Sequence, residues 1–295
     1  MTYRAGFVSF VGRPNVGKST LTNALVGEKV AITSSKPQTT RRAIRGIVHR
    51  DFGQLIVVDT PGLHRPRTLL GQRLNDLVEA TLGDVDVIGF CIPANEKIGI
   101  GDTFINEQLS RYRRAKLVAI VTKSETVSRE KLAEQLLEVQ KLRDWQAIIP
   151  VSAVEGQQLE ELIKLLVEHM PVSEQLYPDE AVTDETIEAR ICELVREAAL
   201  EGVRDELPHS LAVTLDEMNP REDKPLIDVH VNVWVERDSQ KAIVIGKGGS
   251  RLREVGQRAR LEIEKLLGSK VFLSIRVKVA PDWQRDPKQL GRLGF

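Results

Sequence analysis

The feature that most constrains this 295-residue chain is the octapeptide Gly12-Arg13-Pro14-Asn15-Val16-Gly17-Lys18-Ser19. It matches G-x-x-x-x-G-K-[ST], a pattern in which a glycine-rich loop aims backbone N–H groups at phosphates. The apolar run at residues 5–11 predicts a buried parallel strand before the loop, and residues 19–26 predict a helix directly after it. Strand, loop and helix N-terminus therefore follow in the order that an anion site requires.

The side chains of this loop have separate expected tasks. Lys18 is expected to neutralise charge on the β- and γ-phosphates, and the Ser19 hydroxyl is expected to ligate Mg²⁺. An ordinary glycine turn is the alternative, and both flanking segments argue against it. The candidate nucleotide-binding residues of this part of the chain are Gly12, Arg13, Pro14, Asn15, Val16, Gly17, Lys18, Ser19 and Thr20.

Length and composition limit the class of protein. A chain of 295 residues favours two domains, and a content of 41% apolar and 28% charged residues is typical of a globular protein. No run approaches the roughly 18 apolar residues of a membrane span. Residues 1–4 lead directly into the first predicted strand, so we expect no leader and a cytoplasmic location. Cys91 and Cys192 are expected to be buried or incidental thiols in a reducing compartment.

The formal net charge of zero conceals two segments of opposite charge. Residues 157–206 contain fourteen acidic and four basic residues, whereas residues 240–280 contain ten basic and three acidic residues. A basic segment in a neutral protein favours contact with a polyanion. A solvated helix face is the alternative explanation.

Beyond the glycine loop, strand and helix patterns alternate. Residues 43–50 and 54–58 predict a hairpin, which gives the sheet one antiparallel member. The segments that follow predict helices at 69–82, 102–113, 129–144 and 157–169, and strands at 86–92, 116–121 and 147–151. Such repeated units imply an α/β domain with a mostly parallel sheet and helices on both faces.

Polar residues stand where three of these strands end, which is the edge at which open α/β sheets bind ligands. After the first of them, Asp59 is suited to the Mg²⁺ shell, and the backbone N–H of Gly62 can approach a γ-phosphate. The candidate residues at the strand ends are Asp59, Thr60, Pro61, Gly62 and Leu63, then Thr122, Lys123, Ser124 and Glu125, and finally Ser152, Ala153 and Val154.

Together with the QTTRR stretch at Gln38 to Arg42, these motifs resemble the GTPase domain of the translation-factor type. The resemblance implies Mg²⁺-dependent binding and hydrolysis of GTP. It implies that Glu125 accepts hydrogen bonds from the guanine N1–H and amino group, that Lys123 packs over the base, and that the Ala153 N–H meets O6. For the switch hydroxyl that ligates Mg²⁺ beside Ser19 and Asp59, we favour Thr40, with Thr39 second. The candidate catalytic residues are Lys18, Thr40 and Gly62.

The chain departs from the family pattern at two places. The guanine box is usually N-K-x-D, whereas Thr122 and Glu125 stand here, and the extra methylene of glutamate predicts weaker guanine selectivity. Leu63 stands where a glutamine commonly positions the attacking water, and leucine cannot orient water. We therefore expect slow turnover by another route. Asn15 suggests, as a hypothesis, a K⁺ ion near the phosphates.

The remaining chain predicts a second domain after a stretch at 171–178 that favours a linker or docking segment. Its elements are an amphipathic helix at 185–204, strands at 211–215 and 226–235, a basic helix at 251–267 and a final strand at 271–279. A helix and the sequence Ile245-Gly246-Lys247-Gly248-Gly249 precede the basic helix. This order resembles an α+β KH domain of the prokaryotic type, type II, which implies RNA binding.

In a KH domain the glycines let the RNA backbone approach, and apolar strand residues flank the bases. Lys247 would supply charge to phosphate, and the expected ligand is a single strand of about four nucleotides. A glycine helix cap in a small accessory domain is the alternative. The candidate RNA-binding residues are Ile245, Gly246, Lys247, Gly248, Gly249, Arg251 and Arg253.

Nearly the whole chain resembles the bacterial Era family of GTPases. The expected parts are a P-loop GTPase domain at 1–171, a linker at 172–184, a KH domain at 185–282, and a tail at 283–295 that is either docked or frayed. The resemblance implies a monomeric, slowly hydrolysing GTPase whose nucleotide state gates binding to small-subunit ribosomal RNA near its 3′ end. It also implies a role in 30S subunit assembly, and it allows peripheral contact with the cytoplasmic face of the membrane.

Two alternatives remain at this point. A P-loop ATPase with relaxed base specificity requires that the TKSE sequence at 122–125 does not read guanine, and it gives the GxxG segment no use. A non-enzymatic RNA-binding module requires a degenerate nucleotide site. The presence of Lys18, Ser19, Asp59 and Gly62 argues against the second alternative.

Overall fold

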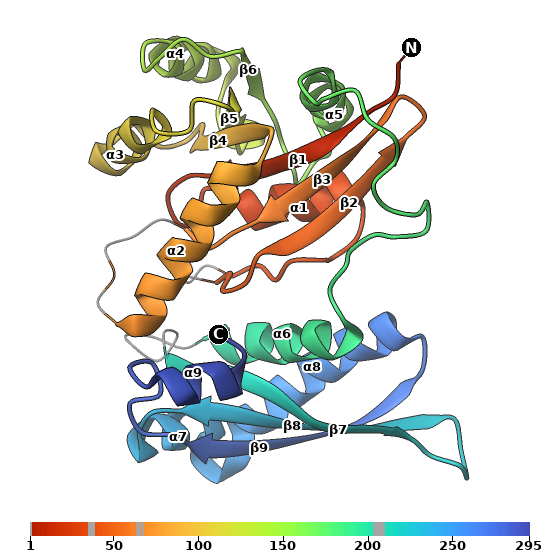
Figure 1. Cartoon of the computed structure of the whole chain (residues 1–295). Coiled ribbons are helices and arrows are strands. Elements are labelled where there is room, and N and C mark those ends of the chain that lie inside the picture. The colour runs from red at the N-terminus through yellow and green to blue at the C-terminus, as the bar shows by residue number, and fades with distance from the viewer. Residues whose placement is uncertain (1, 35–38, 63–65, 67, 203–209) are drawn as a thin grey trace. The chain divides into compact units, whose positions relative to one another are not determined.

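The computed structural model describes residues 2–34, 39–62, 66, 68–202 and 210–295 (Figure 1). They form two compact units, one built from most of the chain up to Asp184 and one that contains Glu185–Phe295. The predictions for Gln38 and Leu63 fall outside the described residues. The mixed α/β architecture predicted from the sequence is confirmed in each unit.

The first unit contains a six-stranded sheet in the order β2-β3-β1-β4-β5-β6. The predicted hairpin is confirmed, because β2 and β3 pair antiparallel while the other neighbours pair parallel. Every residue of β3 and β4 is buried, which explains why these strands have continuous apolar runs. The strands are β1 Arg4–Val11, β2 Ile44–Arg50, β3 Gly53–Asp59, β4 Val87–Pro93, β5 Lys116–Thr122 and β6 Ala147–Pro150.

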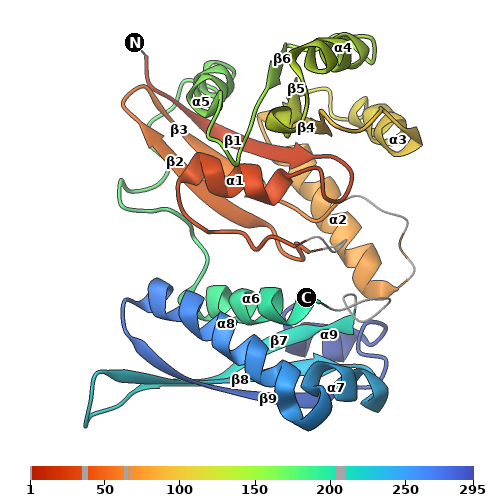
Figure 2. The ribbon, with the colours of Figure 1, turned by 180° about the vertical axis from the view of Figure 1, so that it is seen from behind.

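Helices cover both faces of this sheet, as predicted (Figures 1 and 2). On one face, Leu21 of α1 and Leu162 of α5 share a buried cluster with Phe10 of β1. On the other, helices α2, α3 and α4 pack a second cluster against β4 and β5. The helices are α1 Lys18–Val26, α2 Leu69–Asp84, α3 Ile100–Leu109, α4 Arg129–Gln140 and α5 Leu159–Glu168.

Several helices begin or end a few residues from their predicted bounds, and for α3 and α4 the structure shows a local reason. Helix α3 begins two residues before the predicted start, because the Asp102 carboxylate accepts the Gly99 N–H at 2.9 Å and caps the first turn. Helix α4 ends at Gln140 rather than at residue 144. There the indole N–H of Trp145 donates to the Val139 carbonyl at 2.9 Å, which satisfies an acceptor at the helix end.

The segment after α5 is held along the hairpin of the first unit. The Gln54 side chain donates to the Tyr177 carbonyl at 2.8 Å and accepts the Leu176 N–H at 2.8 Å. Arg45 pairs with Asp184 at 2.6 Å. Residues 172–184 therefore run beside β2 and β3, with a turn at 178–181.

The second unit has a three-stranded sheet in the order β7-β8-β9, with β7 and β8 antiparallel and β8 and β9 parallel. The predicted order of helix, strand, strand, helix, GxxG, helix and strand is confirmed. β7 extends beyond the predicted 211–215, because its pairing continues past a register shift between Leu215 and Glu217. The elements are α6 Ile187–Leu200, β7 Ala212–Pro220, β8 Leu226–Val235, α7 Asp238–Ile245, α8 Ser250–Leu267, β9 Lys270–Val279 and α9 Pro287–Leu293.

The C-terminal tail is docked, so the frayed alternative is wrong. Trp283 is fully buried, its indole N–H donates to the Ser210 carbonyl at 3.2 Å, and its ring stacks on Phe295 with centroids 5.5 Å apart. The tail also forms helix α9, whose Leu290 and Leu293 are buried. Trp283 therefore belongs to the core of the second unit, and the half-buried Phe295 packs on it.

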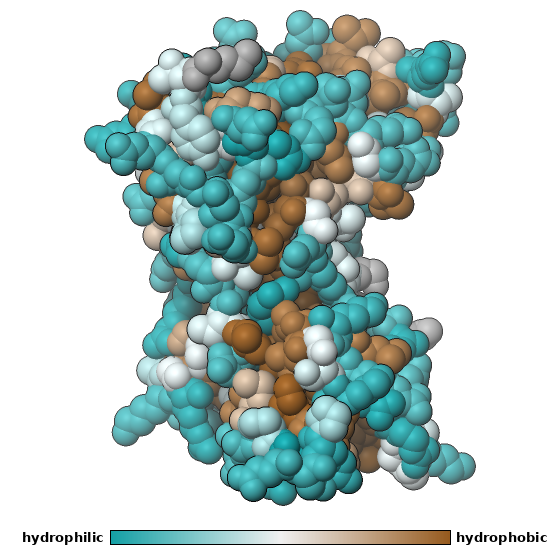
Figure 3. Space-filling view, turned by 90° about the vertical axis from the view of Figure 1, so that its right-hand side faces the viewer, coloured by the Kyte–Doolittle hydropathy of each residue, from teal (hydrophilic) through white to brown (hydrophobic). Residues whose placement is uncertain are grey.

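Two further expectations concern cysteines and membrane spans. Cys91 and Cys192 are not joined in a disulfide, and burial raises the pKa of Cys91 to about 12, so this thiol stays protonated. None of the helices within the described ranges has the length and apolar character to cross a membrane. On the face shown in Figure 3, apolar side chains gather in patches between hydrophilic ones.

Candidate functional site

The glycine loop joins β1 to α1 at the carboxyl edge of the sheet. Asn15 and Gly17 adopt left-handed backbone conformations, with φ of 64° and 100°. Gly17 directly precedes α1 and offers no side chain to cap it, so the first N–H groups of the helix are available to an external acceptor. This geometry is that of an anion site at a helix N-terminus.

Lys18 is held in place by the loop that precedes it. Its Nζ donates to the carbonyls of Gly12 and Arg13 at 3.1 and 2.9 Å, which occupies two of three N–H groups. Burial lowers the pKa of Lys18, opposed by the charge of Asp59. A Cβ added at Gly62 would lie 3.9 Å from Nζ, so the backbone of Gly62 borders the ammonium. The predicted pair of Lys18 and Gly62 is thus brought together.

The three predicted Mg²⁺ ligands converge. The Ser19 hydroxyl donates to Asp59 Oδ2 at 2.8 Å and the Thr40 hydroxyl to the same oxygen at 3.0 Å, while the two hydroxyl oxygens lie 3.2 Å apart. Burial raises the pKa of Asp59, against the hydrogen bonds from both hydroxyls and the charge of Lys18. Asp59 Oδ1 is buried and has no hydrogen-bond partner within the described chain.

This donor set fits a magnesium ion. Carboxylate and hydroxyl oxygens are the hard ligands that Mg²⁺ prefers, and the ion usually completes its shell with water and substrate phosphates. The described residues contain no group of three His, Cys, Asp or Glu side chains that could hold a metal. When bound, Mg²⁺ would be held by Ser19, Thr40 and Asp59 and would neutralise charge on the phosphates of the nucleotide.

The predicted base-reading residues lie on neighbouring loops. The Thr122 hydroxyl donates to the Val16 carbonyl at 2.6 Å and so ties the end of β5 to the glycine loop. Lys123 has a φ of 57°, and the Ser124 N–H donates to the Val151 carbonyl at 3.2 Å. Glu125 Oε2 is buried without a partner within the described chain. A carboxylate oxygen in this state is suited to accept a hydrogen bond from a ligand.

The loop after β6 completes this region. The Ser152 hydroxyl accepts the Glu155 N–H at 3.1 Å, which orders the turn that presents Ala153. Val154 is 78% exposed at the same turn. Thr60 and Pro61 are buried under the edge of the sheet, and the Thr60 hydroxyl has no partner within the described chain.

Arg13 differs from the other loop residues, because its side chain turns to α3. Its guanidinium donates to Asp102 and to Glu96, both at 2.9 Å, and only its carbonyl contacts Lys18. Asp102 is not among the site residues predicted from the sequence. An acidic residue three positions after Gly99 was the signal that predicts a helix cap there.

In the second unit, the GxxG segment forms the turn between α7 and α8. Gly246 has a φ of 73°, and a Cβ added there would lie 2.7 Å from the Arg251 Cβ and 3.0 Å from its backbone nitrogen. Only glycine fits this position. Lys247 is exposed at the tip of the turn, and Ile245 ends α7. The predicted glycine turn is therefore a tight backbone feature with an exposed cation.

The two predicted arginines of α8 have different environments. Arg251 donates to the Ala199, Glu201 and Gly202 carbonyls at 3.3, 2.7 and 3.4 Å, so it caps the end of α6 and serves the fold. Arg253 is exposed, and no ion pair joins it to a carboxylate within the described chain. Of the two, Arg253 is placed to meet a ligand.

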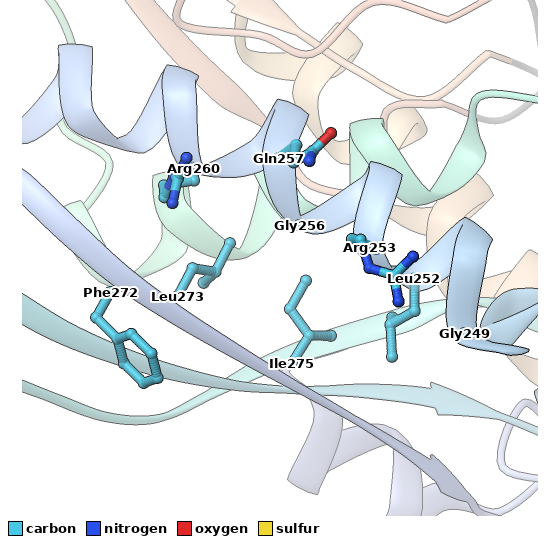
Figure 4. Close-up of a pocket in the computed structure, with 9 residues that line it drawn as sticks. All are labelled: Gly249, Leu252, Arg253, Gly256, Gln257, Arg260, Phe272, Leu273 and Ile275. Carbon is cyan, nitrogen blue, oxygen red and sulfur yellow. The ribbon is translucent and has the colours of Figure 1, made fainter.

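A groove of about 450 Å³ lies between α8 and β9 (Figure 4). The helix contributes two cations and the strand contributes apolar side chains, which is the composition expected for a single-stranded nucleic acid. Sequence reasoning missed Arg260, although Arg253 and Arg260 are seven residues apart and lie on one helix face. The lining residues are Gly249, Leu252, Arg253, Gly256, Gln257, Arg260, Phe272, Leu273 and Ile275.

Comparisons with known proteins agree with this geometry. The family described as 50S ribosome-binding GTPase matches residues 7–151, and the KH domain family matches residues 206–284. The GTPase Era of Mycobacterium sp. strain KMS is 66% identical over 99% of both chains.

Two solved structures match 99% of the chain with a TM-score of 0.94 and 35% identity, and each is covered to 99% of its own length. One is an Aquifex aeolicus Era variant bound to GDP and AlF4⁻, and the other is Era in complex with MgGDPNP and nucleotides 1506–1542 of 16S ribosomal RNA. These matches decide against the ATPase and non-enzymatic alternatives. The chain belongs to the Era family of GTPases.

Proposed function

We propose that this GTPase binds single-stranded small-subunit ribosomal RNA near its 3′ end through the groove between α8 and β9, and that it assists assembly of the 30S subunit. The observation that carries the proposal is the groove itself, with Leu273 and Ile275 on one side and Arg253 and Arg260 on the other. The Era structure that contains 16S ribosomal RNA nucleotides supports the same ligand class.

The groove can bind the bases and the phosphates of an RNA strand on different sides. Unstacked bases would lie on the apolar side chains of β9, where their edges can be read by hydrogen bonds. Phosphates would meet the cations of α8 and the exposed Lys247 at the glycine turn, which fixes the register of the strand. A groove of about 450 Å³ exceeds the space of a single base, and KH clefts hold about four nucleotides.

In the nucleotide site, we assign Lys18 to the γ-phosphate, Gly62 to the same group through its N–H, and Ser19, Thr40 and Asp59 to Mg²⁺. The convergence of the two hydroxyls on Asp59 Oδ2 supports the metal assignment. Glu125 is assigned to guanine, because its buried Oε2 has no partner within the described chain. These contacts would stabilise the charge that develops during phosphoryl transfer.

We further propose that a K⁺ ion near the phosphates supplies part of this stabilisation. Asn15 supports the proposal, since it stands in the glycine loop expected to face the phosphates and its side-chain amide oxygen is of a type that can ligate a cation. GTP hydrolysis should then be faster in K⁺ buffer than in Na⁺ buffer of equal ionic strength. Equal rates would dismiss the ion.

Nucleotide gating requires that GTP and GDP favour different arrangements of the chain, and that RNA binds these arrangements with different affinity. RNA affinity measured without nucleotide, with GDP and with a GTP analogue tests this directly. Equal affinity in all three states would contradict gating while leaving RNA binding intact. Sedimentation in the same states tests the predicted monomer.

The RNA proposal is tested by fluorescence anisotropy with a labelled single strand from the 3′ end of small-subunit ribosomal RNA and with a scrambled strand. The double variant Arg253→Gln/Arg260→Gln should bind the native strand at least about tenfold more weakly. Arg258→Gln is the matched control, because Arg258 lies on α8 but pairs with Glu201 and Glu254. Equal binding of the two strands, or equal loss in control and double variant, would contradict the proposal.

Peripheral membrane contact stays a prediction. Co-sedimentation of the protein with anionic lipid vesicles, with and without GDP, is the measurement that tests it.

A further inference from the structure

The side chain of Arg13 lies in a site that the nucleotide assignment does not use. Its Nε donates to Asp102 Oδ1 and its Nη2 to Glu96 Oε2, both at 2.9 Å. The two partners differ in burial, since the Asp102 side chain is fully buried and the Glu96 side chain is 46% exposed. The buried carboxylate is therefore the partner that fixes the guanidinium.

Asp102 is also fixed from its own side. Its second oxygen accepts the Gly99 N–H at 2.9 Å, so the same carboxylate caps α3 and holds the glycine loop. A fully buried carboxylate is costly unless it is paired and hydrogen-bonded, and both conditions are met here. Displacing Arg13 would leave this carboxylate without its cation.

The first turn of α3 is shaped to receive Arg13. A Cβ added at Gly101 would lie 2.8 Å from the Arg13 Cδ and 3.2 Å from its Cγ. The methylene groups of Arg13 therefore lie flat against the helix at a position where any larger residue would push them away. A glycine, a capping carboxylate and a buried ion pair together make this a built contact.

The contact between Arg13 and α3 is linked to the expected phosphate site through Lys18. The carbonyl of Arg13 accepts a hydrogen bond from Lys18 Nζ at 2.9 Å, and the neighbouring Gly12 carbonyl accepts another at 3.1 Å. Whatever orients the backbone at residues 12–13 therefore orients the ammonium of Lys18. No atom of Asp102 needs to touch the nucleotide for this effect.

We propose that Asp102 is a positioning residue of the nucleotide site, which acts on Lys18 by holding the Arg13 guanidinium against α3. This inference rests on the nucleotide site proposed above. By linkage, nucleotide binding should in turn restrain the first turn of α3, because an ordered loop keeps Arg13 on Asp102.

The first test is release of a fluorescent GDP analogue in stopped flow with Mg²⁺ present. Asp102→Asn retains an oxygen for the Gly99 N–H but loses the charge, and Arg13→Gln removes the cation. Each should release GDP roughly tenfold faster than the parent, since small displacements of positioning groups have large effects. Glu96→Gln, the matched control at the exposed partner, should change release by less than about twofold.

The double variant Arg13→Gln/Asp102→Asn distinguishes positioning from general loss of stability. If the two residues act as one unit, the double variant releases GDP no faster than the faster single variant, whereas independent effects would multiply. The double variant places two neutral amides together and so leaves no unpaired charge. It can therefore still be measured if a single variant folds poorly. Multiplied effects, or single variants that release GDP like the parent, would overturn the inference.

Hydrogen exchange gives a readout that a merely structural role would not change. GDP should slow exchange at residues 99–103 by a factor of about three or more in the parent and have no such effect in Arg13→Gln. A GDP effect that persists in Arg13→Gln would overturn the coupling. If the parent protein binds no GDP, the proposed nucleotide site is contradicted as well. If the parent binds GDP and the variants release it at the parent rate, only the positioning role of Asp102 is contradicted.

Discussion

The nucleotide site of the first unit and the groove of the second unit differ in how far their charged side chains are exposed to solvent. Lys18 is half-buried and Asp59 is fully buried, and burial shifts the pKa of each towards its neutral form. In the groove, Arg253 is exposed and Lys247 stands at the tip of a turn. The first site has its charges fixed before a ligand arrives, whereas the second keeps them hydrated.

This difference separates two ways of binding phosphate. Buried charges are costly until a ligand compensates them, but they act strongly on a ligand because water does not screen them. Exposed charges cost little, act over a longer range and are weakened by salt. We therefore expect single substitutions to have large effects in the nucleotide site and small, salt-dependent effects in the groove.

The largest effect should come from Lys18→Met, which keeps the apolar stem and removes the ammonium. Loss of a preorganised charge at the γ-phosphate should lower the rate of GTP hydrolysis by about 100-fold or more. Single-turnover hydrolysis with saturating Mg²⁺ measures it, and Lys116→Met, at an exposed lysine at the start of β5, is the matched control. A loss below about tenfold would show that the loop does not depend on its buried charge.

The next effect concerns base selectivity. The parent should prefer GDP over ADP by about two orders of magnitude, which corresponds to about 3 kcal/mol, in competition against a fluorescent GDP analogue. Glu125→Ala should lose most of this preference, because it removes the acceptor of the guanine donors. Glu130→Ala, at an exposed position on α4, should keep it. Comparable binding of ADP by the parent would show that the TKSE sequence does not read guanine.

Much of this site could be predicted from local sequence, because its residues lie at strand ends that the α/β alternation brings to one edge. The convergence of Thr40 on Asp59 could be chosen only by resemblance, since the loop before β2 has no periodic pattern. Asp102 and Arg260 were missed for a different reason. Local spacing indicated a helix cap at Asp102 and a helix face shared by Arg253 and Arg260, but it did not identify what these side chains face, Arg13 in one case and the apolar side of the groove in the other.

The fold shows the same division between local and distant signals. The element order of the KH domain followed from alternation and the glycine turn. The role of Arg251 did not, because a basic residue beside GxxG looks like an RNA ligand until the carbonyls at the end of α6 are placed next to it. Trp283 was ambiguous in the sequence for the same reason, since burial of a terminal aromatic depends on the rest of the unit.

A smaller and more diagnostic effect is the response to salt. Raising salt from about 50 to 200 mM should weaken RNA binding by orders of magnitude if several phosphates are contacted, while GDP affinity should change far less. In Arg253→Gln the slope of log affinity against log salt should fall by about one. Arg258→Gln should keep the parent slope. Equal salt slopes for RNA and GDP would remove the distinction between the two sites.

The smallest effect should come from an ionic contact that holds the groove together. Glu264, near the end of α8, accepts hydrogen bonds from Lys270 at 3.0 Å and from the Val271 N–H at 3.2 Å, and these contacts lower its pKa, the Lys270 contact most. The pKa of Glu264 is lower in the folded state than its ordinary value of 4.5. The charged carboxylate therefore stabilises the fold fully at pH values above 4.5, and this stabilisation is lost as the pH falls through the lowered pKa. Glu264→Gln should therefore melt a few degrees below the parent at pH 7, and the two melting temperatures should converge in acid.

Thermal unfolding followed across pH measures this difference, with Glu254→Gln as the control for loss of a surface ion pair on the same helix. A difference that stays constant with pH would mean that the shape of the side chain, and not its charge, joins α8 to β9.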